Sequence, residues 1–281
     1  MSTRKGPNVV VCLPVRNEEK SLKKVLEALT NQKLKPTHIF LTDDGSKDKT
    51  VEIAKKFELV TIKQREDRGF DVVGKIAMAK VANDCIEPST ILHKETPVDF
   101  MITLAGDIIL PENYIDDLVK KFEENENLVV ASGTMIGKDS YKSTGYMVPG
   151  PGRMFRYTFW NRIGAAYPLK QGWEAYPIHL ANMEGLQTMV FSDIEYVPLR
   201  PTGGRTDFVA YGQAMKAFGY YRPLATMRAF KQIFMKKRGI KAWLNMLRGY
   251  YFSKPDLYEP KLRKYIRKTQ KRRLRKLIFR F

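Results

Sequence analysis

The sequence contains few of the residues from which disulfide frameworks and metal clusters are built. Its 281 residues include two cysteines and three histidines. Two cysteines supply neither a disulfide framework nor a cysteine-based metal site. No apolar run approaches the roughly 18 residues of a membrane-spanning helix, and the run that begins at Asn8 is too short for the core of a signal peptide with its cleavage site. We therefore expect a cytoplasmic protein.

Acidic residues are also scarce, and their scarcity is uneven along the chain. There are 49 Lys and Arg against 30 Asp and Glu, which gives a net charge of +19. Residues 261–281 hold eleven Lys and Arg and no acid. Such an excess is typical of proteins with anionic partners. We predict a globular domain over 1–225, closer to neutral, and a basic helical region over 226–281.

Short apolar runs alternate with amphipathic stretches through the first half of the chain. The runs that we predict as strands are 8–15, 37–43, 58–64, 98–104 and 128–135. The segments between them have helical spacing, as in Leu22, Val25, Leu26 and Leu29. Strands that alternate with helices predict an α/β fold with a mostly parallel sheet and helices on both faces.

Three aspartates, Asp43, Asp44 and Asp107, follow predicted strands of this sheet. Ligands of such sheets bind beyond the carboxyl ends of the strands. Carboxylates that meet there repel one another, and a hard divalent cation that also binds phosphate relieves the repulsion. A nucleoside diphosphate is therefore a natural ligand. The alternative is that Asp43-Asp44-Gly45-Ser46 is only a turn with local hydrogen bonds.

Three segments together resemble glycosyltransferase family 2. They are LPVRNEEKSLKKVLEAL, IFLTDDGSKDKT and DFMITLAGDIILPENYI, in this order and with the family's spacing. The resemblance covers roughly residues 8–225. It implies a GT-A-type, Rossmann-like fold and an inverting transferase of the hexosyltransferase type. Its donor would be a nucleotide-diphospho-sugar, used with Mg²⁺ or Mn²⁺.

The resemblance also implies which residues bind the donor. They are Pro14, Arg16, Glu18, Asp43, Asp44, Lys75, Gly106 and Arg200. Asp44 matches the acid that binds the nucleobase. Lys75, at a helix start, suits an anion, although it is also explained as a solvated helix lysine. Arg200, or Arg205, would neutralise the leaving diphosphate.

Asp107 matches the metal ligand of the family's Asp-x-Asp element. Here the element is Ala105-Gly106-Asp107, so its first acid is missing. Many relatives also have a histidine, which joins the metal, where this chain has Pro198. The alternative is that Asp107 is a loop acid ahead of the helix that begins near Pro111.

The resemblance places the catalytic base in QGWEAYPIHL, at Glu174. Inverting transfer to a hydroxyl needs a carboxylate that removes the proton of the attacking oxygen. Ala175 stands where relatives often have a second acid. As an alternative, Glu174 favours the dipole at the start of a helix. Trp173 either stacks on a sugar or belongs to the core.

The C-terminal region combines basic residues with aliphatic and aromatic residues at helical spacing. This pattern favours contact with an anionic membrane surface over nucleic acid, and we expect a peripheral protein on the cytosolic face of the membrane. A glycan or a lipid-linked molecule is then the expected acceptor. Two other functions stay open: a non-catalytic nucleotide-sugar-binding protein, and a nucleic-acid-binding protein that acts through the tail.

Overall fold

The computed structural model describes residues 6–69, 76–136, 147–200, 207–234 and 239–278. The chain forms two compact units. Unit 1 comprises Met1–Asp71, Lys80–Tyr167 and Gly185–Gly204, and unit 2 comprises Val72–Ala79, Pro168–Glu184 and Arg205–Phe281. The division into independent domains at residue 225 stays a prediction.

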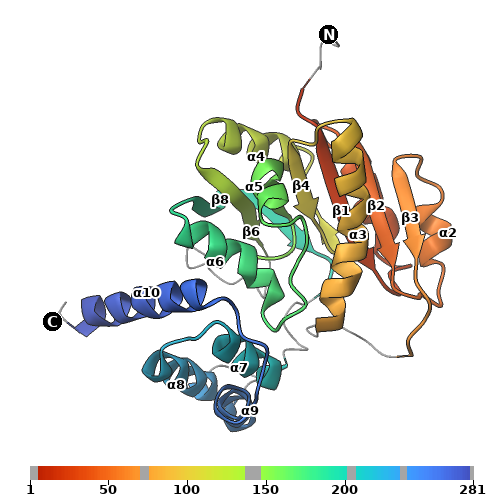
Figure 1. The fold of residues 1–281 in the computed structure, drawn as a ribbon. Helices are drawn as coiled ribbons and strands as arrows, with labels where there is room; N and C mark the ends of the chain where they lie inside the picture. Colours follow the sequence, from red (N-terminus) through yellow and green to blue (C-terminus); the bar gives the residue numbers. More distant parts are fainter. Residues whose placement is uncertain (1–5, 70–75, 137–146, 201–206, 235–238, 279–281) are drawn as a thin grey trace. The chain divides into compact units, whose positions relative to one another are not determined.

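Within the described residues, unit 1 contains one eight-stranded sheet (Figure 1). Its strands are β1 Val9–Val15, β2 His38–Asp43, β3 Val60–Gln64, β4 Phe100–Thr103, β5 Ile108–Ile109, β6 Leu128–Met135, β7 Arg153–Arg156 and β8 Gln187–Pro198. Their order is β3-β2-β1-β4-β7-β6-β8-β5. The pairs from β3 to β4 and the pair β6–β8 are parallel, whereas β5 and β7 run against their neighbours.

Helices cover both faces of this sheet. They are α1 Leu22–Thr30, α2 Thr50–Ala54, α3 Ile76–Glu95, α4 Tyr114–Glu123 and α5 Tyr157–Arg162, and α3 passes from unit 2 into unit 1 between Ala79 and Lys80. Alternate residues of β1, such as Val11 and Leu13, share one core with the buried faces of α1 and α4. On the opposite face, Cys85 Sγ of α3 lies 2.9 Å from the carbonyl oxygen of Phe40 in β2.

The predicted fold class is confirmed. The sheet is mostly parallel with helices on both faces, and a helical region follows it in the sequence. The described residues include no helix with the length and apolar character that crossing a membrane requires.

Unit 2 is helical. Its elements are η1 Trp173–Ala175, α6 Tyr176–Met183, α7 Phe208–Ala217, α8 Arg222–Phe230, η2 Lys231–Phe234, α9 Gly239–Tyr251 and α10 Pro260–Ile278. Helices α7 and α9 cross closely because two glycines lie at the crossing: a Cβ atom would lie 2.1 Å from Met246 O at Gly212, and 2.0 Å from Val209 O at Gly249.

The apolar stripe of α10 packs inside unit 2. Leu262 and Ile266 are buried against Phe218 and Tyr258, whose rings stack with centroids 4.2 Å apart. The first half of α10 is therefore a basic helix that packs its apolar stripe on the rest of unit 2.

Candidate functional site

Most of the predicted donor-binding residues of unit 1 lie at or just after the carboxyl ends of parallel strands. Val15 of β1 pairs with Asp43 of β2, and the N–H of Asp44 donates to Val15 O at 2.9 Å. On the other side of β1, Cys12 pairs with Thr103, the last residue of β4. The chain segments that carry Arg16, Asp44 and Asp107 therefore leave the same edge of the sheet.

Arg200 joins two of these acids. Its Nε donates to Asp107 Oδ2 at 2.9 Å, and its Nη2 donates to Glu18 Oε1 at 2.5 Å. Burial lowers the pKa of Arg200, but hydrogen bonding and the negative charges of Asp107 and Glu18 outweigh it and raise the pKa above its ordinary value. The guanidinium thus lies as a fixed cation between two carboxylates, although its side chain is 55% exposed.

The backbone positions Arg200 beside Asp107. Strand β5, which directly follows Asp107, pairs with the end of β8, so that Ile108 lies opposite Pro198. The N–H of Leu199 donates to Asp107 O at 2.8 Å. Arg200, which directly follows Leu199, is therefore brought to the Asp107 side chain. Proline cannot ligate a metal, and the positive charge at this place comes from a residue two positions later.

Glu18 is held from several sides. Its N–H donates to Thr50 Oγ1 at 2.7 Å, and its Oε2 accepts from Ser21 Oγ at 2.6 Å. A Cβ atom on Gly106 would lie 2.9 Å from Glu18 Cγ and 3.0 Å from Val15 Cγ1. The glycine in the Ala105-Gly106-Asp107 element therefore leaves room for Glu18 to pack beside it.

Asp44 is buried and paired with arginines that follow β3. Its Oδ1 accepts from Arg68 Nη2, and it lies 3.3 Å from Arg65 Nε. Its Oδ2 is buried without a hydrogen-bond partner. One oxygen of this carboxylate is therefore neutralised by the protein, and the other remains as an acceptor.

Asp43 has a local role in the turn after β2. Its Oδ1 and Oδ2 each accept from the N–H of Ser46 at 3.2 Å, and Ser46 Oγ donates to Oδ1 at 2.5 Å. These are the hydrogen bonds that the turn interpretation expected. Direct contact between Asp43 and a nucleotide stays a prediction.

Arg16 ties the ends of β1 and β2 to the segment after β3. Its Nη1 donates to Asp44 O at 2.5 Å, and its Nη2 to Asp67 Oδ1 at 2.7 Å. Hydrogen bonds from Lys47, the Gly69 N–H and Arg16 lower the pKa of Asp67. Our sequence analysis missed Arg65, Asp67 and Arg68. Their position directly after the third predicted strand was the signal that could have found them.

Pro14 lies within β1, opposite Thr42 of β2. In β1 the carbonyls of Val9 and Val15 bond toward β2, whereas the carbonyl of Cys12 accepts from Leu104 on the β4 side. The nitrogen of Pro14 carries no hydrogen and faces β4. The hydrogen-bonded pairing of β1 with β4 has already ended at Cys12. Proline is therefore tolerated one residue before the strand ends.

The structure does not place the other predicted site residues relative to this cluster. Glu174 is exposed in η1 of unit 2, while Asp44, Asp107 and Arg200 belong to unit 1. Trp173 is buried, as the core interpretation expected. Lys75 and Arg205 lie outside the described residues. The assignment of Glu174 as the base stays a prediction.

Comparison with models of protein families identifies the family of this chain. The family model described as Glycosyl transferase family 2 matches residues 10–173, more than half of the chain. The chain belongs to glycosyltransferase family 2. The matched range contains nearly all of β1, strands β2 to β7, and the acids Glu18, Asp44 and Asp107. It ends one residue before Glu174 and also excludes β8 and Arg200. A comparison with curated protein sequences finds no match.

Solved structures of glycosyltransferases share the fold. A Staphylococcus aureus TarS fragment, residues 1–349, aligns with a TM-score of 0.56 and 15% identity, over 87% of this chain and 72% of that one. The same fragment in complex with UDP-GlcNAc gives 0.56 and 14%, over 87% and 73%. The mannosyltransferase PcManGT from Pyrobaculum calidifontis, in complex with GDP-Man and Mn²⁺, gives 0.54 and 13%, over 87% and 69%. These likenesses confirm the GT-A-type fold of the glycosyltransferase.

Proposed function

We propose that this glycosyltransferase is an inverting, divalent-metal-dependent enzyme that transfers a hexose from a nucleotide-diphospho-sugar to an acceptor hydroxyl or lipid phosphate at a membrane surface. The observation that carries the proposal is the bridge from Arg200 to Asp107 and Glu18 beyond the carboxyl ends of the parallel strands. Asp107 and Glu18 share the single positive charge of the Arg200 guanidinium, so the position carries net negative charge. Arg200 is itself a cation within reach of a bound phosphate.

The side chains at this position fit a hard divalent cation. Such an ion prefers carboxylate oxygens and usually takes its remaining ligands from water and substrate phosphates. Asp107 would hold Mg²⁺ or Mn²⁺, with Glu18 beside it, even though the described residues include no group of three His, Cys, Asp or Glu side chains arranged for a metal. When bound, the ion would supply positive charge to the departing diphosphate.

Arg200 has two roles in this proposal. Without donor, it neutralises Asp107 and Glu18. With donor and metal bound, Arg200 would leave Asp107 and pair with a phosphate oxygen, for which the planar guanidinium is well suited. Its 55% exposed side chain has room for this movement. Because one cation replaces another, the carboxylates stay neutralised throughout.

Asp44 would recognise the base of the nucleotide. Its unpartnered Oδ2 is an acceptor for a ring N–H, which both uracil and guanine carry. Arg65 and Arg68 hold the carboxylate in place through Oδ1. A buried acceptor of this kind discriminates strongly, because a base without a matching donor leaves it unsatisfied. The donors of the solved relatives, UDP-GlcNAc and GDP-Man, agree with either base.

Glu174 would take the proton from an acceptor hydroxyl. The acceptor oxygen forms a bond to the anomeric carbon, the bond from that carbon to the diphosphate oxygen breaks, and the configuration inverts. The proton passes to the Glu174 carboxylate, and the nucleoside diphosphate leaves. A lipid phosphate that is already ionised needs no such base, so dependence on Glu174 would distinguish the two acceptor classes.

Release of nucleoside diphosphate tests the proposal directly. The purified chain is incubated with UDP-, GDP- or dTDP-sugars, Mn²⁺ and a panel of glycan and lipid-phosphate acceptors. We expect turnover with one donor class, and we expect Glu174→Gln to bind donor normally but to transfer at least about 100-fold more slowly to a hydroxyl. Donor binding without turnover across the whole panel would favour the non-catalytic nucleotide-sugar-binding alternative.

A further inference from the structure

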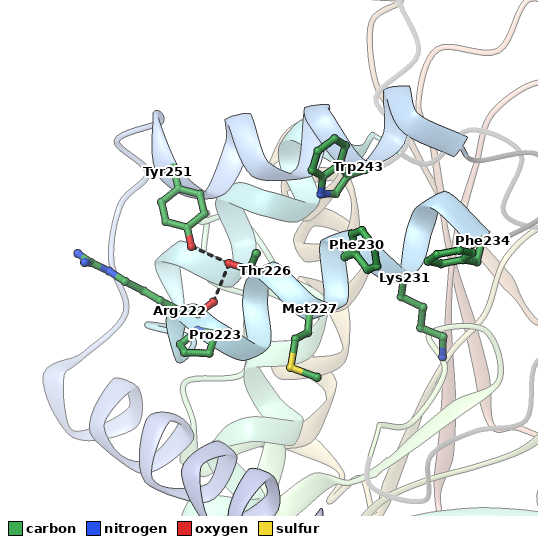
Figure 2. A pocket seen from close by; sticks show the side chains of 9 residues that line it. All are labelled: Arg222, Pro223, Thr226, Met227, Phe230, Lys231, Phe234, Trp243 and Tyr251. Carbon is green, nitrogen blue, oxygen red and sulfur yellow. Dashed lines mark hydrogen bonds between the residues drawn. The ribbon is translucent and has the colours of Figure 1, made fainter. Parts of the chain in front are cut away.

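One surface of unit 2 is apolar and hollow. It is formed by α8, η2 and α9 around a cavity of about 750 Å³. We call it the α8–α9 face and define it by five residues that line the cavity: Met227, Phe230, Phe234, Trp243 and Tyr251. Phe234 is 74% exposed, Met227 56% and Phe230 49%. Figure 2 shows Trp243 from α9 above Phe230 and Phe234, with Met227 below them.

Helix α8 exposes large apolar residues and buries its small ones, and α9 also exposes large apolar residues. In α8, Ala225 and Ala229 face the core of unit 2 while Met227 and Phe230 face outward. In α9, Met246 and Tyr250 are buried, but Ile240 and Leu244 are exposed. An amphipathic helix of a water-soluble domain normally does the reverse. This inverted pattern indicates that the α8–α9 face has a second apolar environment.

The face is rigid enough to present these side chains. The hydroxyl of Thr226 lies 2.7 Å from the Tyr251 hydroxyl and donates to Arg222 O at 3.0 Å, which joins α8 to the end of α9 (Figure 2). The rings of Phe230 and Phe234 pack edge to face, with centroids 5.4 Å apart. Exposed rings are therefore held on a packed scaffold.

The segment that forms the face carries charge of one sign. Residues 208–255 contain ten Lys and Arg and no Asp or Glu. Arg222 and Lys231 line the cavity itself, and in Figure 2 their charged ends extend away from the aromatic cluster. Aromatic and aliphatic side chains within a rim of cations match the acyl region and anionic headgroups of a phospholipid bilayer.

We propose that the α8–α9 face docks on an anionic lipid bilayer and inserts Phe230, Phe234 and Trp243 among the lipids. The inference deepens the proposed function, on which its role in presenting an acceptor rests. It also assigns apolar contact with the membrane to the α8–α9 face and not to α10, because Leu262 and Ile266 of α10 are already buried in unit 2. The exposed lysines and arginines of α10 add charge attraction without insertion.

Vesicle binding with the full chain tests the docking. The probes are vesicles of phosphatidylcholine with and without phosphatidylglycerol, read by co-sedimentation and tryptophan fluorescence. Trp160 and Trp173 are buried, so a blue shift on binding reports on Trp243. The variant Phe230→Ser/Phe234→Ser removes two exposed rings, and Ile91→Ser removes an apolar residue of α3 that is 55% exposed as the matched control. Circular dichroism checks that both variants fold.

We expect the wild type and Ile91→Ser to bind anionic vesicles with a blue shift, and the double variant to bind at least about tenfold more weakly. Equal binding by the double variant, binding without a blue shift, or equal binding to neutral vesicles would overturn the proposal. So would a dimer in solution that the double variant dissociates, since a second copy would then cover the face.

The outcome is separable from the proposed function. Asp107→Asn should bind vesicles as the wild type does, and the double variant should bind donor as the wild type does. If the wild type binds vesicles but no donor, the result would contradict the transferase chemistry and leave the docking intact. The opposite pattern would contradict the docking alone. Binding to RNA at the expense of vesicles, lost in the double variant, would assign the face to nucleic acid.

Discussion

The guanidinium Nε of Arg200 lies 2.9 Å from Asp107 Oδ2, which places a protein cation at the acid that we propose as the metal ligand. The two residues are 93 positions apart in the sequence. They meet because the backbone around Asp107 pairs with the end of β8. In the function that we propose, a metal ion at Asp107 would therefore compete with Arg200.

Removal of Arg200 should strengthen metal binding in the absence of donor. In Arg200→Ala, Asp107 and Glu18 lose their neutralising partner and attract a divalent ion more strongly. The Arg200 side chain is 55% exposed, so water weakens its ion pair with Asp107. The gain in Mn²⁺ affinity should therefore be modest, about twofold to fivefold. Electron paramagnetic resonance of free Mn²⁺ measures it. Arg200→Lys should lie between the wild type and the alanine variant, and unchanged or weaker Mn²⁺ binding in Arg200→Ala would contradict the competition.

Asp44→Asn should weaken nucleotide binding by at least about tenfold, equivalent to about 1.4 kcal/mol. The substitution removes the charge that Arg65 and Arg68 neutralise and lets the amide present a donor where the base needs an acceptor. Calorimetry with UDP and GDP measures the loss. Glu66→Gln, which removes an exposed charge from the same segment, is the control and should bind as the wild type does. Equal affinities of Asp44→Asn and Glu66→Gln would remove Asp44 from the site.

Gly249→Ala should destabilise unit 2 severely. The added methyl group would lie 2.0 Å from Val209 O, so α7 and α9 must move apart. Overpacking of this kind typically costs up to about 3 kcal/mol, which chemical denaturation would detect. Leu244→Ala, on the exposed side of the same helix, should change the free energy of unfolding by less than about 0.5 kcal/mol. Equal effects of the two substitutions would contradict the close crossing.

Buried His179 should make the protein less stable in acid. Burial, with the positive charges of Arg228 and Arg273, lowers its pKa to about 4, and its Nε2 has no hydrogen-bond partner. Between pH 6.5 and 4 the unfolded chain therefore binds the proton and the folded chain does not. The free energy of unfolding should fall by up to about 3 kcal/mol as the pH falls through this window. Denaturation of His179→Leu should show a shallower pH dependence; an unchanged slope would exclude His179 as its source.

The order of strands and helices in the first half of the chain was predictable, because apolar runs and helical spacing are local signals. Other elements were not. Residues 153–167 have helical spacing, yet Arg153–Arg156 forms β7 because it pairs with β4 and β6. Residues 188–204 look like two short strands with a turn, but parallel pairing with β6 makes Gln187–Pro198 one strand, β8, with a register shift near Gly133.

The residues of the candidate site also divide into those that local sequence patterns predict and those that depend on contacts between distant segments. Asp44 and Asp107 are visible in the sequence because each follows an apolar run and matches a family segment. The pairing of Arg65 and Arg68 with Asp44 depends on the neighbouring positions of β2 and β3, which no local pattern specifies. The meeting of Arg200 with Asp107 depends on the antiparallel pairing of β5 with β8, a contact between segments far apart in the chain.

The most direct test of the central claim is calorimetric titration of UDP- and GDP-sugars into the wild type and Asp107→Asn, each with and without Mn²⁺. We predict that one donor binds the wild type at least about tenfold more tightly with Mn²⁺, and that Asp107→Asn abolishes this dependence. Donor binding that ignores Mn²⁺, or that survives unchanged in Asp107→Asn, would contradict the assignment of Asp107 as the residue that holds the metal.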